Sequence, residues 1–224
     1  MPAMAMEIDG AAIAADRLLD ILDRSAEDVT LPAHDTFAIE GEPAVWLWRL
    51  EEGTVRQVKL MADGRQQIVG FPTFGDWIGL AAEGRYCASA ETTRRSRLKR
   101  VRRTVLDRAL EERPELQREI NGKLAIALAA AQDQIVLLGR LTARERLVRF
   151  LVDRARGRPG APLPPAGTEI ELPMIRGDIA DYLGLTIETT SRLFSRLRGE
   201  GLIDWHGRHM VVLLDPDRLA GEVH

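Results

Sequence analysis

The sequence predicts an α+β chain in which a β-rich half is followed by a long helix and a mainly helical half. Residues 36–101 form short alternating runs separated by glycines, as in a closed or nearly closed β-sandwich. Residues 115–139 carry apolar side chains at steps of four and three, as in a coiled coil. Residues 175–193 form two short helical patterns broken at Gly184. A chain of 224 residues is long enough for two small domains with their own cores.

In the β-rich half, strands are expected at residues 44–50, 54–60 and 66–71. Hairpin turns at residues 51–53 and 62–64 are expected to join them, because each turn ends in a glycine that tolerates a left-handed backbone. A short amphipathic helix over residues 13–22 precedes these strands. Another helix, over residues 103–113, is expected to end before Pro114, since the residue before a proline disfavours the helical conformation.

The long helix over residues 115–139 contains a seam with the heptad spacing of a two-stranded coiled coil. The seam residues are Leu124, Leu128, Ala131, Ile135 and Leu138. A helix that packs on its own domain would show a similar period. A parallel homodimer is favoured if residues 175–193 form a helix-turn-helix, as argued below, because such a motif normally binds DNA as two copies, one per half-site about 34 Å apart.

The C-terminal half is predicted to begin with a helix over residues 142–156, whose Leu147, Phe150 and Leu151 face inward. A proline-rich loop follows at residues 157–167. Strands are expected at residues 169–172 and 210–214, and the second of them forms a wing after Gly207.

Residues 175–193 predict a helix-turn-helix. Gly184 allows the first helix to end in a left-handed conformation, and the hydroxyl of Thr186 can accept an N–H of the second helix. The outward face of the second helix would then enter the major groove of DNA. The residues expected to face inward are Ile179, Ala180 and Leu183 in the first helix and Ile187, Thr190, Leu193 and Leu197 in the second.

Three outward residues of the second helix suit base recognition. Arg192 can donate two parallel hydrogen bonds to guanine, Glu188 can accept one from cytosine, and Ser191 can bond a base or contact a thymine methyl group. A plain surface ion pair between Glu188 and Arg192, which are four residues apart, is the alternative. The Gly184 turn and the helix before it favour DNA recognition.

The net charge of −3 argues against a general nucleic-acid coat protein and predicts a local basic footprint instead. In the second helix, three arginines (Arg192, Arg196 and Arg198) outnumber two glutamates (Glu188 and Glu200). Arg208 lies in the wing between His206 and His209 and can add a phosphate contact. The further DNA-contacting residues expected are Thr186, Thr189, Arg196, Arg176 and Arg208.

The stretch from Ile175 to Arg192, with Leu202 and Ile203, closely resembles the helix-turn-helix of the CRP/FNR transcription regulators. The FNR/FixK branch is the most similar, because its recognition helix carries Glu-x-x-Ser-Arg, as residues 188–192 do here. Residues 62–71, 75–79 and 111–116 also resemble FixK proteins. The resemblance therefore covers roughly residues 30 to 218.

This resemblance implies a double-stranded β-helix sensor domain of the cyclic-nucleotide-binding type at residues 1–113, a dimerisation helix at residues 114–140 and a winged helix-turn-helix at residues 141–224. It implies a homodimeric activator that reads a TTGAT-type inverted repeat, a palindromic operator in double-stranded DNA, and recruits RNA polymerase. Glu188, Ser191 and Arg192 occupy the contact positions. A repressor would use the same contacts, so the choice of activator depends on the resemblance.

The sensor half lacks the residues that the family's effectors require. The cyclic-nucleotide pocket of the family combines Gly-Glu-Leu with an Arg-Ser pair that holds the phosphate. The matching stretches here are 75–77 (Gly-Asp-Trp) and 87–89 (Cys-Ala-Ser), so that arginine is missing, although Arg85 is near. One cysteine excludes a four-cysteine iron–sulfur cluster within the chain, and His34 at a polar turn is typical of a surface residue and not of a haem ligand. We therefore expect no cofactor, with haem, cyclic nucleotide or oxidation of Cys87 as alternative controls.

Residues 94–103 include seven basic side chains, which are expected to form a solvated strand face; RNA polymerase or flanking DNA phosphate are the alternative partners. An enzyme of the metal-dependent cupin type is disfavoured, because its chemistry needs clustered ligands and the β region has only His34. No signal peptide is evident, and no apolar run is expected to span a membrane. A single cysteine suits the reducing cytoplasm.

Overall fold

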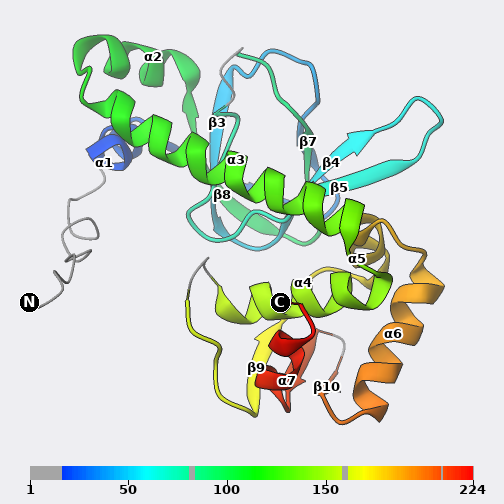
Figure 1. Cartoon of the computed structure of the whole chain (residues 1–224). Helices are drawn as coiled ribbons and strands as arrows, with labels where there is room; N and C mark the ends of the chain where they lie inside the picture. The colour runs from blue at the N-terminus through cyan, green and yellow to red at the C-terminus, as the bar shows by residue number, and fades with distance from the viewer. Residues whose placement is uncertain (1–16, 81–83, 158–160, 208, 224) are drawn as a thin grey trace, which may run out of the picture.

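The structure is a computed structural model that describes residues 17–80, 84–157, 161–207 and 209–223. Figure 1 shows a β-rich N-terminal part, a long helix α3 (Leu116–Arg140) that passes across it, and a C-terminal part in which helices surround a small sheet. The predicted α+β class and the order of its parts are confirmed.

The N-terminal part consists of two antiparallel four-stranded sheets. Their orders are β1-β8-β3-β6 and β2-β7-β4-β5. The space between the sheets is filled by the chain's own side chains: the rings of Phe37 and Trp48 lie 4.9 Å apart, and the indole of Trp48 donates to the hydroxyl of Tyr86 at 3.2 Å. The strands are β1 (Glu27–Leu31), β2 (Thr36–Ala38), β3 (Trp46–Glu52), β4 (Val55–Leu60), β5 (Gln66–Gly70), β6 (Trp77–Ile78), β7 (Ser89–Thr92) and β8 (Ser96–Arg102).

One of the two predicted hairpins is wrong. After Glu52 the chain crosses from one sheet to the other, because β3 pairs with β8 and β6 whereas β4 pairs with β7 and β5. Gly53 has a φ of +103°, and a Cβ there would lie 2.2 Å from Oγ of Ser96, which accepts the N–H of Thr54 at 3.1 Å. The second hairpin, between β4 and β5 at Gly64 (φ +83°), is confirmed.

Three helices cover one end of the N-terminal part. The first is α1 (Arg17–Arg24), which overlaps the helix expected at residues 13–22. Residues 13–16 lie outside the described residues. The second, α2 (Arg103–Glu112), continues directly from β8 and ends before Pro114, as predicted. These two helices and the start of α3 share one apolar cluster with the sheets: Leu18, Leu22, Leu47, Val101, Leu106, Ala109, Leu116 and Ile120.

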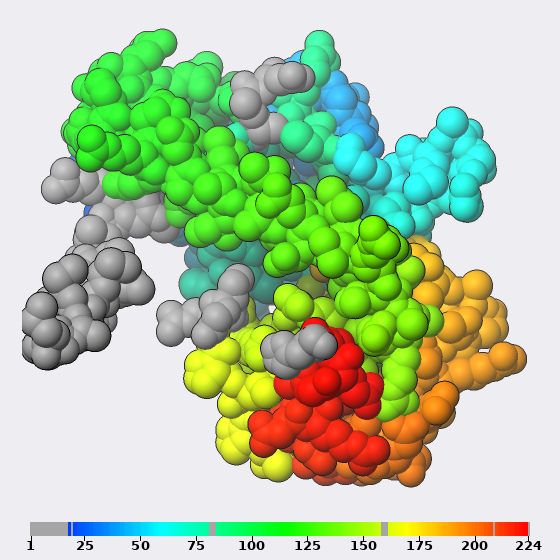
Figure 2. All heavy atoms as spheres, viewed as in Figure 1, coloured from blue at the N-terminus to red at the C-terminus, as the bar shows by residue number. Residues whose placement is uncertain are grey.

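The middle of α3 is exposed to solvent on the surface of the chain (Figure 2). Leu128 is 61% exposed and Ile135 is 71% exposed, so the centre of the seam has no packing partner within the described residues. We expected no run apolar enough to cross a membrane, and this is wrong by the criteria of length and composition. Helix α3 has 25 residues, and its most apolar window has a mean hydropathy of 1.2. An apolar coiled-coil seam accounts equally well for this composition.

The C-terminal part is a winged helix-turn-helix with a three-stranded sheet of order β10-β11-β9. Helix α4 begins with a capping box, in which Thr142 and Glu145 each bond the other's backbone N–H. Leu147, Phe150 and Leu151 are buried, as predicted. The elements are α4 (Ala143–Arg156), β9 (Thr168–Glu171), α5 (Arg176–Leu183), α6 (Ile187–Gly199), β10 (Ile203–His206), β11 (Met210–Leu213) and α7 (Pro216–Gly221).

Candidate DNA-binding site

The turn between α5 and α6 has the geometry that the sequence predicts. Gly184 ends α5 with φ 63° and ψ 40°, and the N–H of Leu185 donates to the carbonyl of Ala180 at 2.9 Å. A Cβ on Gly184 would lie 3.2 Å from Cδ2 of Leu138 on α3. Both the left-handed backbone and the close approach therefore favour glycine at this position.

Thr186 caps α6. Its Oγ1 accepts the N–H of Thr189 at 3.2 Å and lies 3.1 Å from the Thr189 hydroxyl. This bond satisfies one of the free N–H groups of the first turn, so the start of α6 is ordered before any DNA is present. The predicted capping role is confirmed.

The inward faces agree with the prediction in α5 and depart from it in α6. Ile179, Ala180 and Leu183 are buried. In α6 the buried residues are Thr190, Phe194 and Leu197, whereas Leu193 is only half-buried and Ile187 is 48% exposed. Phe194 was missed, although its step of four from Thr190 and three to Leu197 places it on the same helix face.

The outward face of α6 presents Glu188, Ser191 and Arg192, all exposed. Within the described residues Glu188 and Arg192 form no ion pair with each other, so both side chains remain available to a ligand. Thr189 is half-buried beside them. The structure thus brings the three base-reading candidates together on one exposed turn and a half of helix.

The other arginines of the predicted footprint have acidic partners. Arg196 pairs with Glu200 at 2.9 Å. Arg198 pairs with Asp204 at 2.8 Å and lies over the ring of Trp205 at 4.4 Å. The backbone N–H of Trp205, together with Arg198, holds the pKa of Asp204 below its usual value. Arg198 therefore stabilises the base of the wing, and the basic footprint of α6 is narrower than the sequence count implies.

Arg176 and Arg208 are the two candidates away from α6. The guanidinium of Arg176, at the start of α5, lies 3.5 Å from the centre of the Phe194 ring. Burial in this position lowers the pKa of Arg176. Arg208 lies outside the described residues, between the exposed His206 and His209.

The predicted seam on α3 divides into a free centre and covered ends. Leu128, Ala131 and Ile135 are exposed. Leu124 is half-buried against the cluster of α1 and α2, and Leu138 is half-buried against the core of the C-terminal part. The chain itself therefore covers part of the seam's two ends.

The effector candidates of the sensor half are engaged within the chain or lie on its surface. Asp76 accepts the N–H and the hydroxyl of Thr73 at 2.8 and 2.9 Å, and Arg85 donates to the carbonyl of Gly41 at 2.6 Å. His34 is exposed at a turn 3.5 Å from Glu91. Cys87 is exposed.

The basic run at residues 94–103 forms β8 and its flanks. Most of its charges are paired: Arg94 with Glu171, Arg97 with Glu52, Lys99 with Asp23, Arg100 with Glu27 and Arg103 with Asp107. Arg100 and Arg102 also lie over the ring of Trp46 at 4.3 and 4.6 Å. Contacts within the chain therefore balance most of the charges of this strand face.

Comparison with known proteins places both parts of the chain. Residues 145–222 match the family described as the Crp-like helix-turn-helix domain, and residues 28–113 match the cyclic nucleotide-binding domain. The chain is 41% identical over 189 residues to the nitrogen fixation regulation protein FixK of Bradyrhizobium diazoefficiens. The matched residues make up 83% of this chain and 77% of that protein. It is 40% identical over 184 residues to the transcriptional activatory protein AadR of Rhodopseudomonas palustris, covering 81% and 75%.

A solved structure has the same fold. The structure of FixK2 from Bradyrhizobium japonicum matches with a TM-score of 0.81 at 35% identity, over 88% of this chain and 96% of that one. Proteins of this kind are transcription regulators and not enzymes. The sensor fold, the exposed recognition helix and these relatives all agree: the chain belongs to the CRP/FNR family, as a FixK-like, DNA-binding transcription regulator.

Proposed function

We propose that the chain acts as a homodimer that binds a TTGAT-type inverted repeat through α6 and activates transcription by recruiting RNA polymerase, without a small-molecule ligand. The observation that carries the proposal is the exposed triad of Glu188, Ser191 and Arg192, whose side chains have no ion-pair partner in the described part of the chain, on a helix whose first turn is already capped. An arginine free of acidic partners can make the bidentate bond to guanine, and the neighbouring carboxylate can accept from cytosine.

Two copies are proposed because one recognition helix reads only one half-site. The exposed centre of the α3 seam, Leu128, Ala131 and Ile135, is where the second copy would pack. Contact between two such seams would remove the exposed isoleucine and leucine from water, which favours association. We assign residues 1–113 to the sensor domain, 114–140 to the dimerisation helix and 141–224 to the DNA-binding domain.

Further contacts to the DNA backbone are proposed for Thr186, Thr189, Arg176, Arg196 and Arg208. Arg196 is 69% exposed at its side chain even though it pairs with Glu200, so it can exchange that carboxylate for a phosphate. A protein of this kind would work in the cytoplasm, where bacterial chromosomal DNA lies.

Action without a ligand is proposed from the state of the sensor domain. Phe37, Trp48 and Tyr86 occupy the space between its sheets. Asp76, in the stretch that matches Gly-Glu-Leu, and Arg85, near the stretch that matches Arg-Ser, both bond to the chain itself. A buried effector would have to displace these contacts. The match to the cyclic nucleotide-binding domain therefore describes a fold and not, in our proposal, a ligand.

Transcription in vitro tests the proposal as a whole. Purified protein and RNA polymerase are combined on a promoter that carries a TTGAT-type inverted repeat, first with no ligand and then with cyclic AMP. Activation without ligand is expected, with no further rise on addition of the nucleotide. A strict requirement for the nucleotide would contradict the ligand-free proposal, and repression would contradict the activator assignment.

Redox control through Cys87 is the second candidate, because its thiol is exposed and so accessible to an oxidant. Operator affinity is measured for the wild type and for Cys87→Ser, each with and without peroxide. Control through this thiol predicts that peroxide changes only the wild-type affinity. Equal responses in the two proteins would remove Cys87 from the regulation.

A further inference from the structure

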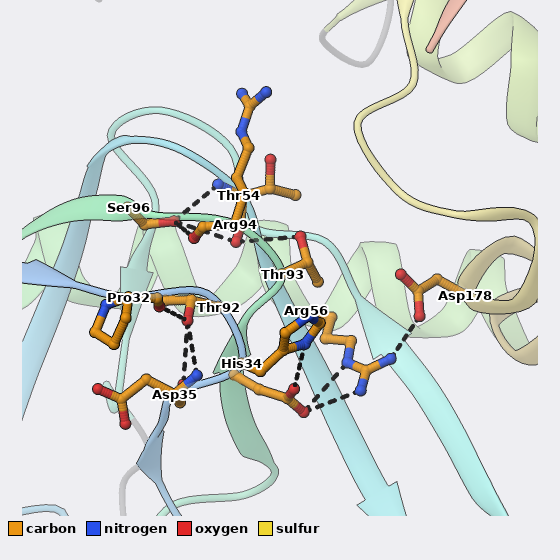
Figure 3. A network of polar contacts seen from close by, with 11 residues as sticks. Pro32, His34, Asp35, Thr54, Arg56, Thr92, Thr93, Arg94, Ser96 and Asp178 are labelled. Atoms are coloured by element: carbon orange, nitrogen blue, oxygen red, sulfur yellow. Dashed lines mark hydrogen bonds and ion pairs between the residues drawn. The ribbon is translucent and has the colours of Figure 1, made fainter. Parts of the chain in front are cut away.

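The sensor domain and the helix-turn-helix are joined by polar contacts at both ends of α5. At its first turn, Nη1 of Arg56 on β4 donates to Oδ1 of Asp178 at 2.5 Å (Figure 3). The same guanidinium donates through Nε and Nη2 to Oε2 of Glu91 on β7, at 3.3 and 3.0 Å. Asp178 is only 3% exposed, so its carboxylate depends on Arg56 for compensation of its charge.

The last turn of α5 is held by the neighbouring strand. The side-chain amide of Gln67 on β5 donates to the backbone carbonyls of Asp181, at 2.5 Å, and Tyr182, at 3.3 Å. These carbonyls belong to the last turn of the helix, where no intrahelical N–H is available to them. Gln66 adds a bond to the carboxylate of Asp181 at 2.7 Å.

Apolar contacts fill the space between these two attachments. Ile68 and Phe71 of the sensor domain belong to the same buried cluster as the core of the helix-turn-helix. The rings of Phe71 and Tyr182 lie 5.3 Å apart, and the guanidinium of Arg154 lies over Phe71 at 5.2 Å. The two domains therefore share one core at this junction.

Two attachments on one helix fix its direction as well as its position. Asp178 and Tyr182 are four residues apart, which corresponds to about 6 Å along a helix axis. The orientation of α6 is coupled to that of α5, because Arg176 of α5 lies on the ring of Phe194 of α6 and the Gly184 turn joins the two helices. Whatever holds α5 to the sensor domain therefore also orients the recognition face.

We propose that Arg56 and Gln67 are positioning residues for DNA recognition, which hold α5 and α6 at the angle that an inverted repeat of one particular spacing requires. The inference depends on the proposed binding of an inverted repeat by a homodimer. In a regulator switched by a ligand, differential binding to two states would supply this orientation. Here contacts within the chain supply it.

The test compares operators that differ only in the spacing of their half-sites. Affinities of the wild type, Arg56→Met and Gln67→Ala are measured on a series of inverted repeats whose spacer is lengthened and shortened by one and two base pairs. The wild type should prefer one spacing. In each variant the ratio of affinities between that spacing and the others should fall, by roughly tenfold. A variant that was only less stable would lose affinity for every spacing alike and keep the ratio.

The matched control is Arg65→Met, which removes an arginine from the tip of the same β4–β5 hairpin, where, among the described residues, its side chain pairs only with the exposed Asp63. Its spacing preference should equal that of the wild type. If Arg56→Met fails to fold because Asp178 is left unpaired, Gln67→Ala decides the question, since it removes hydrogen bonds without stranding a charge.

The outcomes separate this inference from the function on which it rests. If the wild type binds no inverted repeat at any spacing, the proposed function fails. If the wild type binds with a preferred spacing and both variants keep the full preference, the positioning role is wrong and the function stands. Equal wild-type affinity for all spacings also overturns the inference, because it would mean that α6 is not held at a fixed angle.

Discussion

Replacement of Ile135 by glutamate should separate the proposed dimer. The side chain is 71% exposed on α3 in the single chain. Complete burial of an isoleucine contributes roughly 1.5–3 kcal/mol, so a partner that covers the exposed part can supply roughly 1–2 kcal/mol per protomer. Over the two copies this amounts to roughly 2–4 kcal/mol, or about a 30- to 700-fold change in the dimer dissociation constant. Glutamate adds the cost of placing two like charges in an apolar seam.

Sedimentation equilibrium over a range of concentrations measures this constant directly. Ile135→Glu should raise the dimer Kd by at least about 30-fold. Its operator affinity should fall at the protein concentrations at which the variant has become monomeric. Asp133→Lys is the matched control, because residue 133 lies about 200° around the helix from residue 135 and is also exposed. An Ile135→Glu protein with the wild-type dimer constant would show that the seam does not form the interface, and our assignment of α3 would have to be withdrawn.

Three other substitutions test the recognition unit. Arg192→Ala should cost about 1–3 kcal/mol of operator binding and relax the preference at the guanine of each half-site, measured on single-base operator variants; uniform weakening on all of them would mean that Arg192 contacts only phosphate. Gly184→Val should lower Tm and operator affinity, because φ is +63° and Leu138 lies close, whereas Gly199→Ala on exposed α6 should not. Arg144 holds the pKa values of Glu200 and Glu222 below their usual range through hydrogen bonds, so the stability from these pairs is present above about pH 4.3 and is lost as the pH falls through the lowered values. Arg144→Met should therefore lower Tm at pH 7 and flatten the loss of Tm below about pH 4; an unchanged acid profile would contradict this assignment.

Local signals made the helix-turn-helix predictable. A glycine at a left-handed turn and a threonine cap act within a few residues of their own positions, so Gly184 and Thr186 could be assigned from their neighbours. The long helix α3 could also be predicted, because a helical period depends only on spacing. The features that were missed depend on partners far away in sequence. The prediction of a hairpin at Gly53 is wrong because the residue that this turn packs against, Ser96, belongs to a strand far along the chain.

Contacts between different elements, and the order of burial within one helix face, limited the prediction of the site. Counting arginines in α6 overestimated its basic footprint, since the partner of Arg198 is Asp204 in the wing. Ile187 was assigned inward from its apolar character, whereas Phe194 fills that face and carries Arg176 on its ring. The link from Arg56 to Asp178 spans 122 residues, and no local pattern indicates it.

Arg146 bonds both to the end of α3 and to the recognition unit. The guanidinium of Arg146 on α4 donates to the carbonyls of Leu138 at 2.7 Å and Leu141 at 2.9 Å, at the end of α3, and to that of Leu183 at 3.0 Å, at the end of α5. Gln134 of α3 adds a bond to the carbonyl of Tyr182 at 2.9 Å. The end of α5 is therefore bonded both to the sensor domain and to the helix that would carry the second copy. A helix held from two sides cannot turn independently of either. In the proposed dimer, the same group of contacts would therefore set both the angle of α6 and the separation of the two recognition helices. This arrangement explains in physical terms how a regulator of this family could stay ready to bind DNA without an effector.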